Sequence, residues 1–457
     1  MDSSIIERKR SLSAFWRQYD GFLRFRQTMG AVVFGSGIVI ALSLVGTGYT
    51  SVGILSMVAV ALVSLADYLY VPMPAIADEK VQRQKILAKL RLGNLWIWLQ
   101  TLMGREHIMQ IARRNFHPEA TKNPPDPEVM TEDMELDGVT VRIYQPADLQ
   151  GEEKLPGVVY FHGGGFCWES FGLYDIMIKT MLKLKRMVVV YVRYRLAPEF
   201  PFPAAVDDCF TVTRYVQKNT KQFKMDPQRL ALMGDSAGGN LTMNMLIRMI
   251  TEAVPDLPKF KVQIAIYPYI QALDFKTPSY QIYDNNKTPT LLNADLMIKF
   301  LVTYALGFAT FDESEIRKLL ENKHWTTELR NSNLPKLVHN DVLPENLERP
   351  NIKMPVSKSI DSSLARKFND IFLDPRFSPL LADDEILGKM PKTYVMSTEL
   401  DCIRDDAFFL TDRLRKLGVD VTHRHWGGMD HAFLVFSTYE SSLKALQEIT
   451  NYLNDNL

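Results

Sequence analysis

The sequence contains one serine in the setting that a catalytic nucleophile requires. Residues 233–239 read MGDSAGG, so Gly234, Ser236 and Gly238 form a G-x-S-x-G pattern. A nucleophilic serine of this kind sits on a sharp turn from a strand into a helix, and only small neighbours let the chain bend there. The strand-like run RLALM precedes the pattern, and the helix-like run GNLTMNMLIRMI follows it. The sequence therefore predicts Ser236 as a nucleophile, whereas an ordinary glycine-rich turn is the alternative.

A second glycine-rich run supplies what an acyl transfer on such a serine needs. Residues 160–166 read YFHGGGF and continue an apolar run. The tetrahedral intermediate of acyl transfer needs backbone N–H donors directed at its oxyanion, and glycines let the main chain approach a substrate closely. We expect these donors to be Gly163 and Gly164 together with Ala237, the residue after the nucleophile. We expect His162, which begins the turn, to brace it rather than to react.

The serine needs a base, and one of the eight histidines is well placed to provide it. His431 lies in GGMDHAF, in a loop between the last predicted strand and the last predicted helix. From this loop a side chain can reach the carboxyl edge of a parallel sheet, where the nucleophile turn also lies. His423 and His425 lie inside a predicted strand and are expected to share one face of the sheet. The histidines outside these motifs are expected to face solvent: His107, His117, His324 and His339.

The acid that orients the base is expected in the segment ELDCIRDD, residues 399–406. This segment follows a predicted strand and lies between the nucleophile and the base, in the chain order that this type of triad requires. We choose Asp401 because it lies one loop beyond the end of the strand. Glu399 is the competing candidate. Asp405 and Asp406 open the next predicted helix, where the helix dipole favours carboxylates in any case.

The elements that must position these residues alternate between strands and helices. Several of the strand-like runs are apolar throughout, which is typical of strands covered on both faces. The repeated strand–helix–strand order predicts a mostly parallel sheet flanked by helices, an α/β fold. An insert at 271–375 interrupts this order, and an insert of that length usually forms a cap. We predict strands at 138–144, 157–161, 188–192, 229–233, 262–267, 393–396 and 421–425, and helices at 174–185, 203–220, 238–251, 405–417 and 438–453.

The N-terminal part of the chain contains an uncharged segment, residues 29–66. Its two apolar runs, 29–45 and 52–66, are separated by the small residues GTGYTS. A helix of about 20 apolar residues spans a bilayer, so the segment is long for one crossing and short for two. A single crossing and a hairpin both fit it. Lys and Arg are nearly balanced on its two sides and favour a cytosolic N-terminus only slightly.

Composition excludes several other classes of protein. The 53 Lys and Arg residues balance 53 Asp and Glu residues, so the basic footprint of a typical nucleic-acid binder is missing. The three cysteines, Cys167, Cys209 and Cys402, are too few and too scattered for a zinc module or a disulfide framework. The chain is therefore expected to be an enzyme-sized α/β protein with a membrane anchor.

Taken together, the motifs resemble the hormone-sensitive-lipase-like branch of the α/β-hydrolases. The resemblance rests on HGGGF, GDSAGGN, DCIRDD and DHAF, and on YRLAPEFPFPAA at 194–205. Within this branch, the N-terminal anchor and the stretch DPRFSPLLA at 374–382 are similar to the group of arylacetamide deacetylase and neutral cholesterol ester hydrolase. The resemblance covers residues 138–453 apart from the central insert.

This resemblance implies a serine hydrolase of carboxylic esters, and in some members of amides, that works without a metal or an organic cofactor. It carries over Ser236, Asp401 and His431 as the catalytic triad. It also implies an anchor in the endoplasmic reticulum membrane with a luminal catalytic domain, and lipophilic ester or amide substrates. No nucleic-acid partner is expected, because the charges balance. The alternative is a non-catalytic ligand-binding receptor of the same fold, and the intact Ser236 and His431 count against it.

The resulting division of the chain has four parts. A cytosolic segment at 1–28 precedes the transmembrane anchor at 29–66. A linker and cap region at 67–132 follows, and the α/β-hydrolase domain occupies 133–457 with the insert at 271–375.

The resemblance leaves the state of the cysteines open. Arylacetamide deacetylase pairs a cysteine after the HGGG turn with a cysteine three residues before the acid. Cys167 matches the first position, whereas Thr398 occupies the second. Cys402 could replace the missing partner, and three free thiols are the alternative.

Two sequons offer a test of which side of the membrane the domain occupies. Asn240 opens the helix behind the nucleophile, where a glycan would hardly fit, so we expect it to be bare. Asn286 lies in the polar segment DNNKTP, and we expect it to be glycosylated in a luminal domain.

Overall fold

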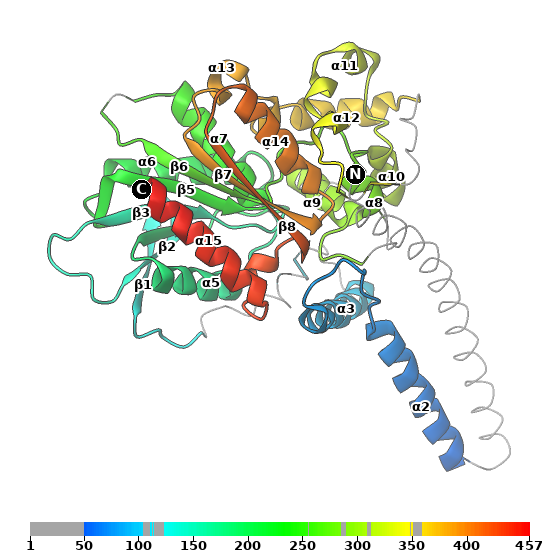
Figure 1. Ribbon diagram of the computed structural model, residues 1–457. Coiled ribbons are helices and arrows are strands. Elements are labelled where there is room, and N and C mark those ends of the chain that lie inside the picture. The colour runs from blue at the N-terminus through cyan, green and yellow to red at the C-terminus, as the bar shows by residue number, and fades with distance from the viewer. Residues whose placement is uncertain are drawn as a thin grey trace. The chain divides into compact units, whose positions relative to one another are not determined.

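The computed structural model describes residues 50–103, 110–111, 113, 123–254, 256–284, 289–308, 312–347, 349–350 and 359–457. The chain forms two compact units, residues 1–104 and 105–457. In the first unit, α2 (Thr50–Leu69) is followed by α3 (Lys80–Met103), as Figure 1 shows. The predicted cytosolic segment 1–28 and the first apolar run, 29–45, lie outside the described residues.

α2 is long and apolar enough to cross a membrane. Its stretch Ser51–Leu69 has 19 residues, and only 6% of the most apolar part is buried in the protein, in contrast to a core helix. Among the described helices it is the one with this length and composition. The helix contains the second predicted apolar run, 52–66, and continues past it to Leu69.

The second unit is built on one sheet of eight strands in the order β1-β2-β4-β3-β5-β6-β7-β8. β1 pairs antiparallel with β2 and β2 antiparallel with β4, whereas every other neighbouring pair is parallel. The predicted mostly parallel sheet is therefore confirmed. The strands are β1 (Val129–Leu136), β2 (Val139–Pro146), β3 (Leu155–Phe161), β4 (Val188–Val192), β5 (Met225–Asp235), β6 (Phe260–Ile266), β7 (Lys392–Leu400) and β8 (Val421–Asp430).

β1 is not among the predicted strands, and its composition explains why. The strand reads VMTEDMEL, and only its end residues, Val129 and Leu136, are buried. It lies at the edge of the sheet and pairs with a single neighbouring strand. Charged residues on such an edge strand discourage its pairing with another chain. A strand of this kind lacks the apolar run or strict alternation that identified the other seven.

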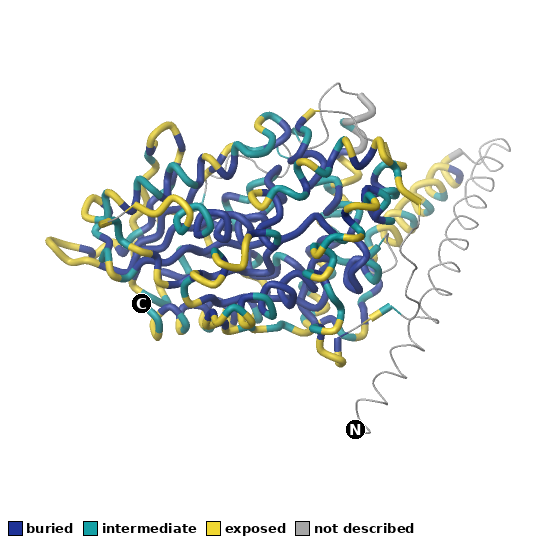
Figure 2. Tube along the Cα trace, turned by 90° about the horizontal axis from the view of Figure 1, so that it is seen from above, coloured by how far each residue is buried: buried dark blue, intermediate teal, exposed yellow. Residues whose placement is uncertain are grey.

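Helices cover both faces of the sheet. On one face, α5 (Phe171–Leu184) contacts α15 (Glu440–Asn456). On the other face, α6 (Ala204–Lys218) contacts α7 (Ala237–Thr251), and α14 (Arg404–Lys416) lies on this face as well (Figure 1). The central strands between these layers are largely buried, and Figure 2 shows buried segments running through the middle of the protein. All five helices overlap the predicted ones.

The insert between β6 and β7 is helical, in agreement with the predicted cap. His324 in this insert is completely buried and faces the carbonyl oxygen of Leu273, which corrects the expectation that it faces solvent. The remaining elements between β6 and β8 are α8 (Pro278–Ile282), α9 (Ala294–Leu306), α10 (Glu313–Leu320), α11 (Thr327–Asn331), η1 (Leu334–Leu337), η2 (Asn340–Val342), α12 (Ser362–Phe372), η3 (Pro379–Leu381) and α13 (Asp384–Leu387), and η4 (Phe433–Val435) follows β8.

The start of α7 packs so closely against the end of β3 that a glycine is required there. A Cβ at Gly238 would lie 1.9 Å from the carbonyl oxygen of Phe161, a backbone atom that cannot move aside. We therefore expect Gly238→Ala to destabilise the protein by about 1–3 kcal/mol or more, as overpacking does. A Cβ at Gly427 in β8 would meet no atom within 4 Å, so Gly427→Ala is the matched control. Denaturant midpoints of the solubilised full chain measure both, and equal midpoints would contradict the expectation.

Candidate active site

Ser236 occupies a strained turn between β5 and α7. Its φ of 55° and ψ of −117° lie in a region that residues with side chains rarely adopt. The turn is held because the Ser236 N–H donates to the carbonyl oxygen of Ile266 at 2.9 Å, and the Ser236 carbonyl accepts from the Tyr269 N–H at 3.2 Å. A Cβ at Gly234 would lie 2.4 Å from the carbonyl oxygen of Gly238, which explains the small residues of the motif.

His431 and Asp401 line up behind this serine. His431 Nε2 lies 2.8 Å from Ser236 Oγ, and His431 Nδ1 lies 2.8 Å from Asp401 Oδ2. Ser236 follows β5, Asp401 follows β7 and His431 follows β8, so the carboxyl edge of the sheet brings the three together. In this arrangement the imidazole can take the serine proton on Nε2 while Nδ1–H donates to the carboxylate.

The carboxylate of Asp401 is held in a fixed orientation. Its Oδ1 accepts from the Ile403 N–H at 2.9 Å, and its Oδ2 accepts from the Thr398 hydroxyl at 3.3 Å in addition to His431. Asp401 is completely buried, whereas Ser236 and His431 are 6% and 4% exposed. Both oxygens therefore have partners, and the oxygen nearer the histidine is positioned to fix the tautomer and orientation of the ring.

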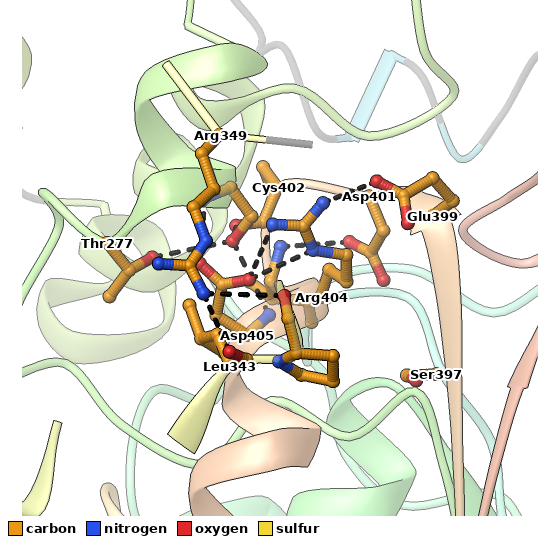
Figure 3. A network of polar contacts seen from close by, with 12 residues as sticks. Thr277, Leu343, Arg349, Ser397, Glu399, Asp401, Cys402, Arg404 and Asp405 are labelled. Atoms are coloured by element: carbon orange, nitrogen blue, oxygen red, sulfur yellow. Dashed lines mark hydrogen bonds and ion pairs between the residues drawn. The ribbon is translucent and has the colours of Figure 1, made fainter. Parts of the chain in front are cut away.

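Glu399, the competing acid, belongs to a different cluster. Its carboxylate forms an ion pair with Arg404 and a hydrogen bond with His425 Nε2, the latter at 3.0 Å. Figure 3 shows Arg404 between Glu399 and Asp405, and its guanidinium is completely buried. Burial alone would raise the pKa of Glu399, but Arg404 and His425 lower it. Its carboxylate is thus occupied by these two side chains rather than by His431.

The same cluster contains an arrangement that resembles a second triad. Ser397 Oγ lies 2.9 Å from both His423 Nε2 and His425 Nδ1, and His425 continues to Glu399. Ser397 is completely buried within β7, so no substrate reaches it. Burial, with a contribution from the neighbouring His425, lowers the pKa of His423 to about 3. This set of residues is therefore a structural network of the sheet.

Asp405 and Asp406 do more than open a helix. Asp405 pairs with Arg404 and accepts the Ser279 N–H at 2.8 Å. Asp406 accepts the Ile270 N–H and a side-chain N–H of Gln271, each at 3.1 Å. Both carboxylates are completely buried, and they attach the acid segment to the start of the insert.

The structure corrects one predicted oxyanion donor. The Gly163 N–H points into the fold, where Asp235 Oδ1 and the Tyr174 hydroxyl oxygen each lie 2.9 Å away. This N–H is therefore committed within the protein and is not directed at a substrate. The expectation for Gly163 was wrong because it counted glycines from the histidine without knowing which way the turn rotates each peptide.

Gly165 replaces Gly163 as a candidate oxyanion donor, beside Gly164 and Ala237. Gly164 and Gly165 have φ values of 112° and 59°, which a residue with a Cβ would adopt only with strain. Among the residues that the structure describes, none accepts a hydrogen bond from the N–H of Gly164, Gly165 or Ala237. Sequence reasoning missed Gly165, although the third glycine of HGGG was the available signal.

His162 lies at the base of the oxyanion turn. Its ring stacks on that of Tyr194 with centroids 4.1 Å apart, and its Nδ1 lies 2.7 Å from the carbonyl oxygen of Gly163. The Tyr194 hydroxyl in turn donates to the carbonyl oxygen of His162 at 2.7 Å. These contacts place His162 among the packing residues of the turn and away from the reacting serine.

Asp235, the residue before the nucleophile, is the shared partner of several elements. Its carboxylate accepts from the hydroxyls of Tyr160 on β3 and Tyr174 on α5, each at 2.8 Å, and from the Gly163 N–H. Burial raises the pKa of this carboxyl to about 6, although these hydrogen bonds lower it. Asp235 thereby couples the nucleophile turn to the oxyanion turn.

The insert completes the surroundings of the site. A Cβ at Gly165 would lie 2.4 Å from the Phe300 ring, so α9 packs directly on the oxyanion turn. Cys167 Sγ lies 3.8 Å from the carbonyl oxygen of Phe300. All three cysteines are buried and free. The structure thus contains the three free thiols that the sequence left as an alternative, and no Cys167–Cys402 bridge.

The two sequons lie in different settings. The Asn240 side chain is completely buried and donates to the carbonyl oxygen of Phe377 at 3.0 Å, in agreement with the expectation that it is bare. Asn286 lies outside the described residues.

The comparisons with known proteins agree on one family. A model of the α/β-hydrolase fold matches residues 158–337 and 345–435. Arylacetamide deacetylase of Bos taurus is 33% identical over 402 residues, which are 86% of this chain and 97% of that protein. Neutral cholesterol ester hydrolase 1 of Rattus norvegicus is 30% identical over 84% of this chain and 94% of its own length. A solved hyperthermophilic esterase of Pyrobaculum calidifontis is 26% identical with a TM-score of 0.55, and the match covers 76% of this chain and 93% of that structure.

The two candidate acids are separated by replacing each with its amide. Asp401→Asn should lower the turnover of a chromogenic ester by roughly three to four orders of magnitude, because the amide leaves the histidine in the wrong tautomer. Glu399→Gln should lower stability, because it weakens a buried ion pair, and should keep most of the turnover. Turnover and unfolding midpoint are measured on both variants. A larger loss of turnover in Glu399→Gln than in Asp401→Asn would reverse the assignment of the acid.

The raised pKa of Asp235 predicts a pH-dependent stability difference. The charged carboxylate is disfavoured in the folded chain, so the contribution of Asp235 to wild-type stability falls as the pH rises from the unfolded pKa of 3.8 to the folded value of about 6. Asp235→Asn removes this titration. Relative to wild type, its unfolding free energy should rise by about 3 kcal/mol between about pH 4 and pH 7. Denaturant titrations at several pH values measure the difference, and a flat profile would rule out the titration.

Proposed function

Because this chain belongs to the α/β-hydrolase family and is an ester-hydrolysing enzyme, we propose that Ser236, His431 and Asp401 are its catalytic triad. The single observation that carries the proposal is the unbroken line of two 2.8 Å contacts from the serine hydroxyl through the imidazole to the buried carboxylate. The strained serine backbone supports it, because strain of this kind is typical of the nucleophile turn.

The reaction begins when Ser236 Oγ attacks the acyl carbon and its proton passes to His431 Nε2. The oxyanion that forms accepts hydrogen bonds from the N–H groups of Gly164, Gly165 and Ala237. His431 then gives the proton to the leaving alcohol or amine, and an acyl-enzyme remains on Ser236. Water, deprotonated by His431, attacks this ester and releases the carboxylic acid. Asp401 keeps the ring oriented and stabilises the imidazolium in both steps.

The substrates that we propose are lipophilic esters, with amides of aromatic amines as a second class. The names of the two relatives support these classes, because one is called an arylacetamide deacetylase and the other a cholesterol ester hydrolase. The membrane-compatible helix α2 is consistent with a substrate that partitions into lipid. Initial rates across esters of increasing acyl length and their amide analogues determine which class the enzyme prefers.

The proposed location of the enzyme is the endoplasmic reticulum membrane. Residues 1–28 are the cytosolic segment, the anchor 29–66 crosses once, and the hydrolase domain 133–457 is luminal. The described part of the anchor, residues 50–66, lies in α2. The apolar, mostly exposed surface of α2 supports the anchor. The luminal orientation rests on the similarity to the arylacetamide deacetylase group and on the sequon at Asn286.

Replacing the nucleophile gives the direct test of the triad. Ser236→Ala should lower ester hydrolysis by about 1,000-fold or more and abolish labelling by a fluorophosphonate probe, because no oxygen remains to be acylated. Its unfolding midpoint should stay close to that of wild type, since a single small hydroxyl is removed. Ser397→Ala, in the second Ser–His–Glu arrangement, is the matched control and should still react with the probe. Retention of a tenth of the wild-type turnover in Ser236→Ala would reject Ser236.

The orientation of the domain is tested through its sequon. In a luminal domain, Asn286 should carry a glycan, so glycosidase treatment of protein from microsomes should increase its electrophoretic mobility. Asn286→Gln should remove this change. An unshifted wild-type band, together with digestion of the domain by protease added outside sealed microsomes, would place the active site in the cytosol and establish a hairpin anchor.

A further inference from the structure

α3, the helix that follows the apolar helix α2, has an unusual charge distribution. Its 24 residues, KVQRQKILAKLRLGNLWIWLQTLM, include five Lys and Arg residues and no Asp or Glu. The basic residues occupy the first half of the helix, and the second half is apolar and aromatic. The reaction proposed above uses none of them.

One face of α3 combines these two properties. Lys85, Lys89, Leu92 and Trp96 follow one another at intervals of four, three and four residues, so they lie in a single stripe along the helix. All four are exposed, with Leu92 at 44% and Trp96 at 53%. On the opposite side, the early residues Arg83, Ile86 and Leu87 are buried. The stripe is thus an exposed face of α3 that carries both basic and apolar side chains, whereas Asn94, farther along the opposite side, is an exposed polar residue.

Hydrogen bonds fix α3 to the end of α2. Gln84 bridges the connection, because its Nε2 donates to the carbonyl oxygen of Leu69 at 3.0 Å and its Oε1 accepts the Val71 N–H at 3.1 Å. Arg91 donates to the carbonyl oxygens of Tyr68 and Tyr70, and the Tyr68 hydroxyl donates to the carbonyl oxygen of Arg91. α3 is therefore held at the level where the apolar helix ends, which in a membrane is the headgroup region.

We propose that the exposed stripe of α3 lies on the bilayer surface and binds anionic lipid headgroups. This proposal rests on the proposed membrane anchor. Lys85 and Lys89 contact the headgroups, and Trp96 and Leu92 enter the boundary between headgroups and acyl chains. The chemistry matches the partner, since lysines near an anionic surface are attracted to it and tryptophans concentrate at the membrane–water interface. Helices that lie in the plane of the interface are rich in Lys and Arg, which reach the headgroups, and in Trp and Leu, which enter the boundary with the acyl chains.

The experiment measures which side of α3 touches lipid in the full-length protein. The chain is reconstituted into vesicles of phosphatidylcholine and phosphatidylserine, and a fluorophore is attached to Leu92→Cys on the stripe or to Asn94→Cys on the other side of the helix. The three native cysteines are buried, so labelling is restricted to the new thiol. Lipids brominated near the headgroup end of the acyl chain then quench a fluorophore that lies at the interface.

We expect strong quenching at position 92 and weak quenching at position 94. Equal quenching at the two positions, whether strong or weak, would overturn the proposal. Alkaline extraction of the same vesicles reports on the anchor separately. If the chain stays in the vesicles and position 92 is not quenched, the anchor holds and the stripe does not bind lipid. If the chain is extracted, both proposals fail.

The role of charge is tested by neutralising the two lysines. Each lysine near an anionic surface should raise the ratio of docked to undocked helix about fivefold, so Lys85→Gln/Lys89→Gln should lower it about 25-fold. Quenching at position 92 should then fall toward the value at position 94 in vesicles with phosphatidylserine and change little in phosphatidylcholine alone. Lys218→Gln/Lys221→Gln, exposed lysines of the hydrolase unit, are the matched control and should leave quenching unchanged. Ester turnover of all variants should equal that of wild type, and unchanged quenching in the α3 variant would rule out recognition of anionic lipid.

Discussion

One buried carboxylate, Asp235, links the parts of the active site that must stay in register. It immediately precedes the nucleophile, and it accepts hydrogen bonds from β3, from α5 and from the first glycine of the oxyanion turn. By taking up the Gly163 N–H, it sets the rotation of the turn and leaves the following peptides to face the substrate. A carboxylate suits this place because it accepts several hydrogen bonds at once, and its burial makes those hydrogen bonds strong.

The insert is a structural part of the site as well as a cover over it. Ser279 and Tyr283 bind the backbone of the acid segment through Cys402 and Glu399, with distances of 2.8 Å and 2.7 Å. The buried Arg404 joins Glu399 to Asp405, and Figure 3 shows Arg349 of the insert in the same network, donating to the carbonyl oxygen of Leu343. Removing one partner from such a buried ion cluster leaves an uncompensated charge, so the cluster holds the Asp401 loop in one conformation. The cap and the acid loop must therefore move together.

The sequence was sufficient for the features that depend on local chemistry. The seven predicted strands, the mostly parallel sheet and the membrane-compatible helix follow from patterns of a few residues each, and the comparisons confirm the family. The same patterns predicted Ser236, Asp401 and His431 as site residues, and the fold brings both Ser236 and Asp401 into contact with His431. The errors concern properties that only tertiary structure decides. The rotation of one peptide excludes Gly163, an edge strand needs no apolar run, and His324 is buried because distant segments close around it.

The order of the strands along the chain has a consequence for biosynthesis. The nucleophile and the histidine that contacts it are 195 residues apart, and β8, which precedes that histidine, is the last strand to be made. A nascent chain that has completed β6 already contains the serine and the oxyanion turn, yet it has neither acid nor base. The α2 helix leaves the ribosome long before either of them. Ester cleavage therefore begins only after β8 and the histidine that follows it have been made, long after the apolar helix α2 has left the ribosome.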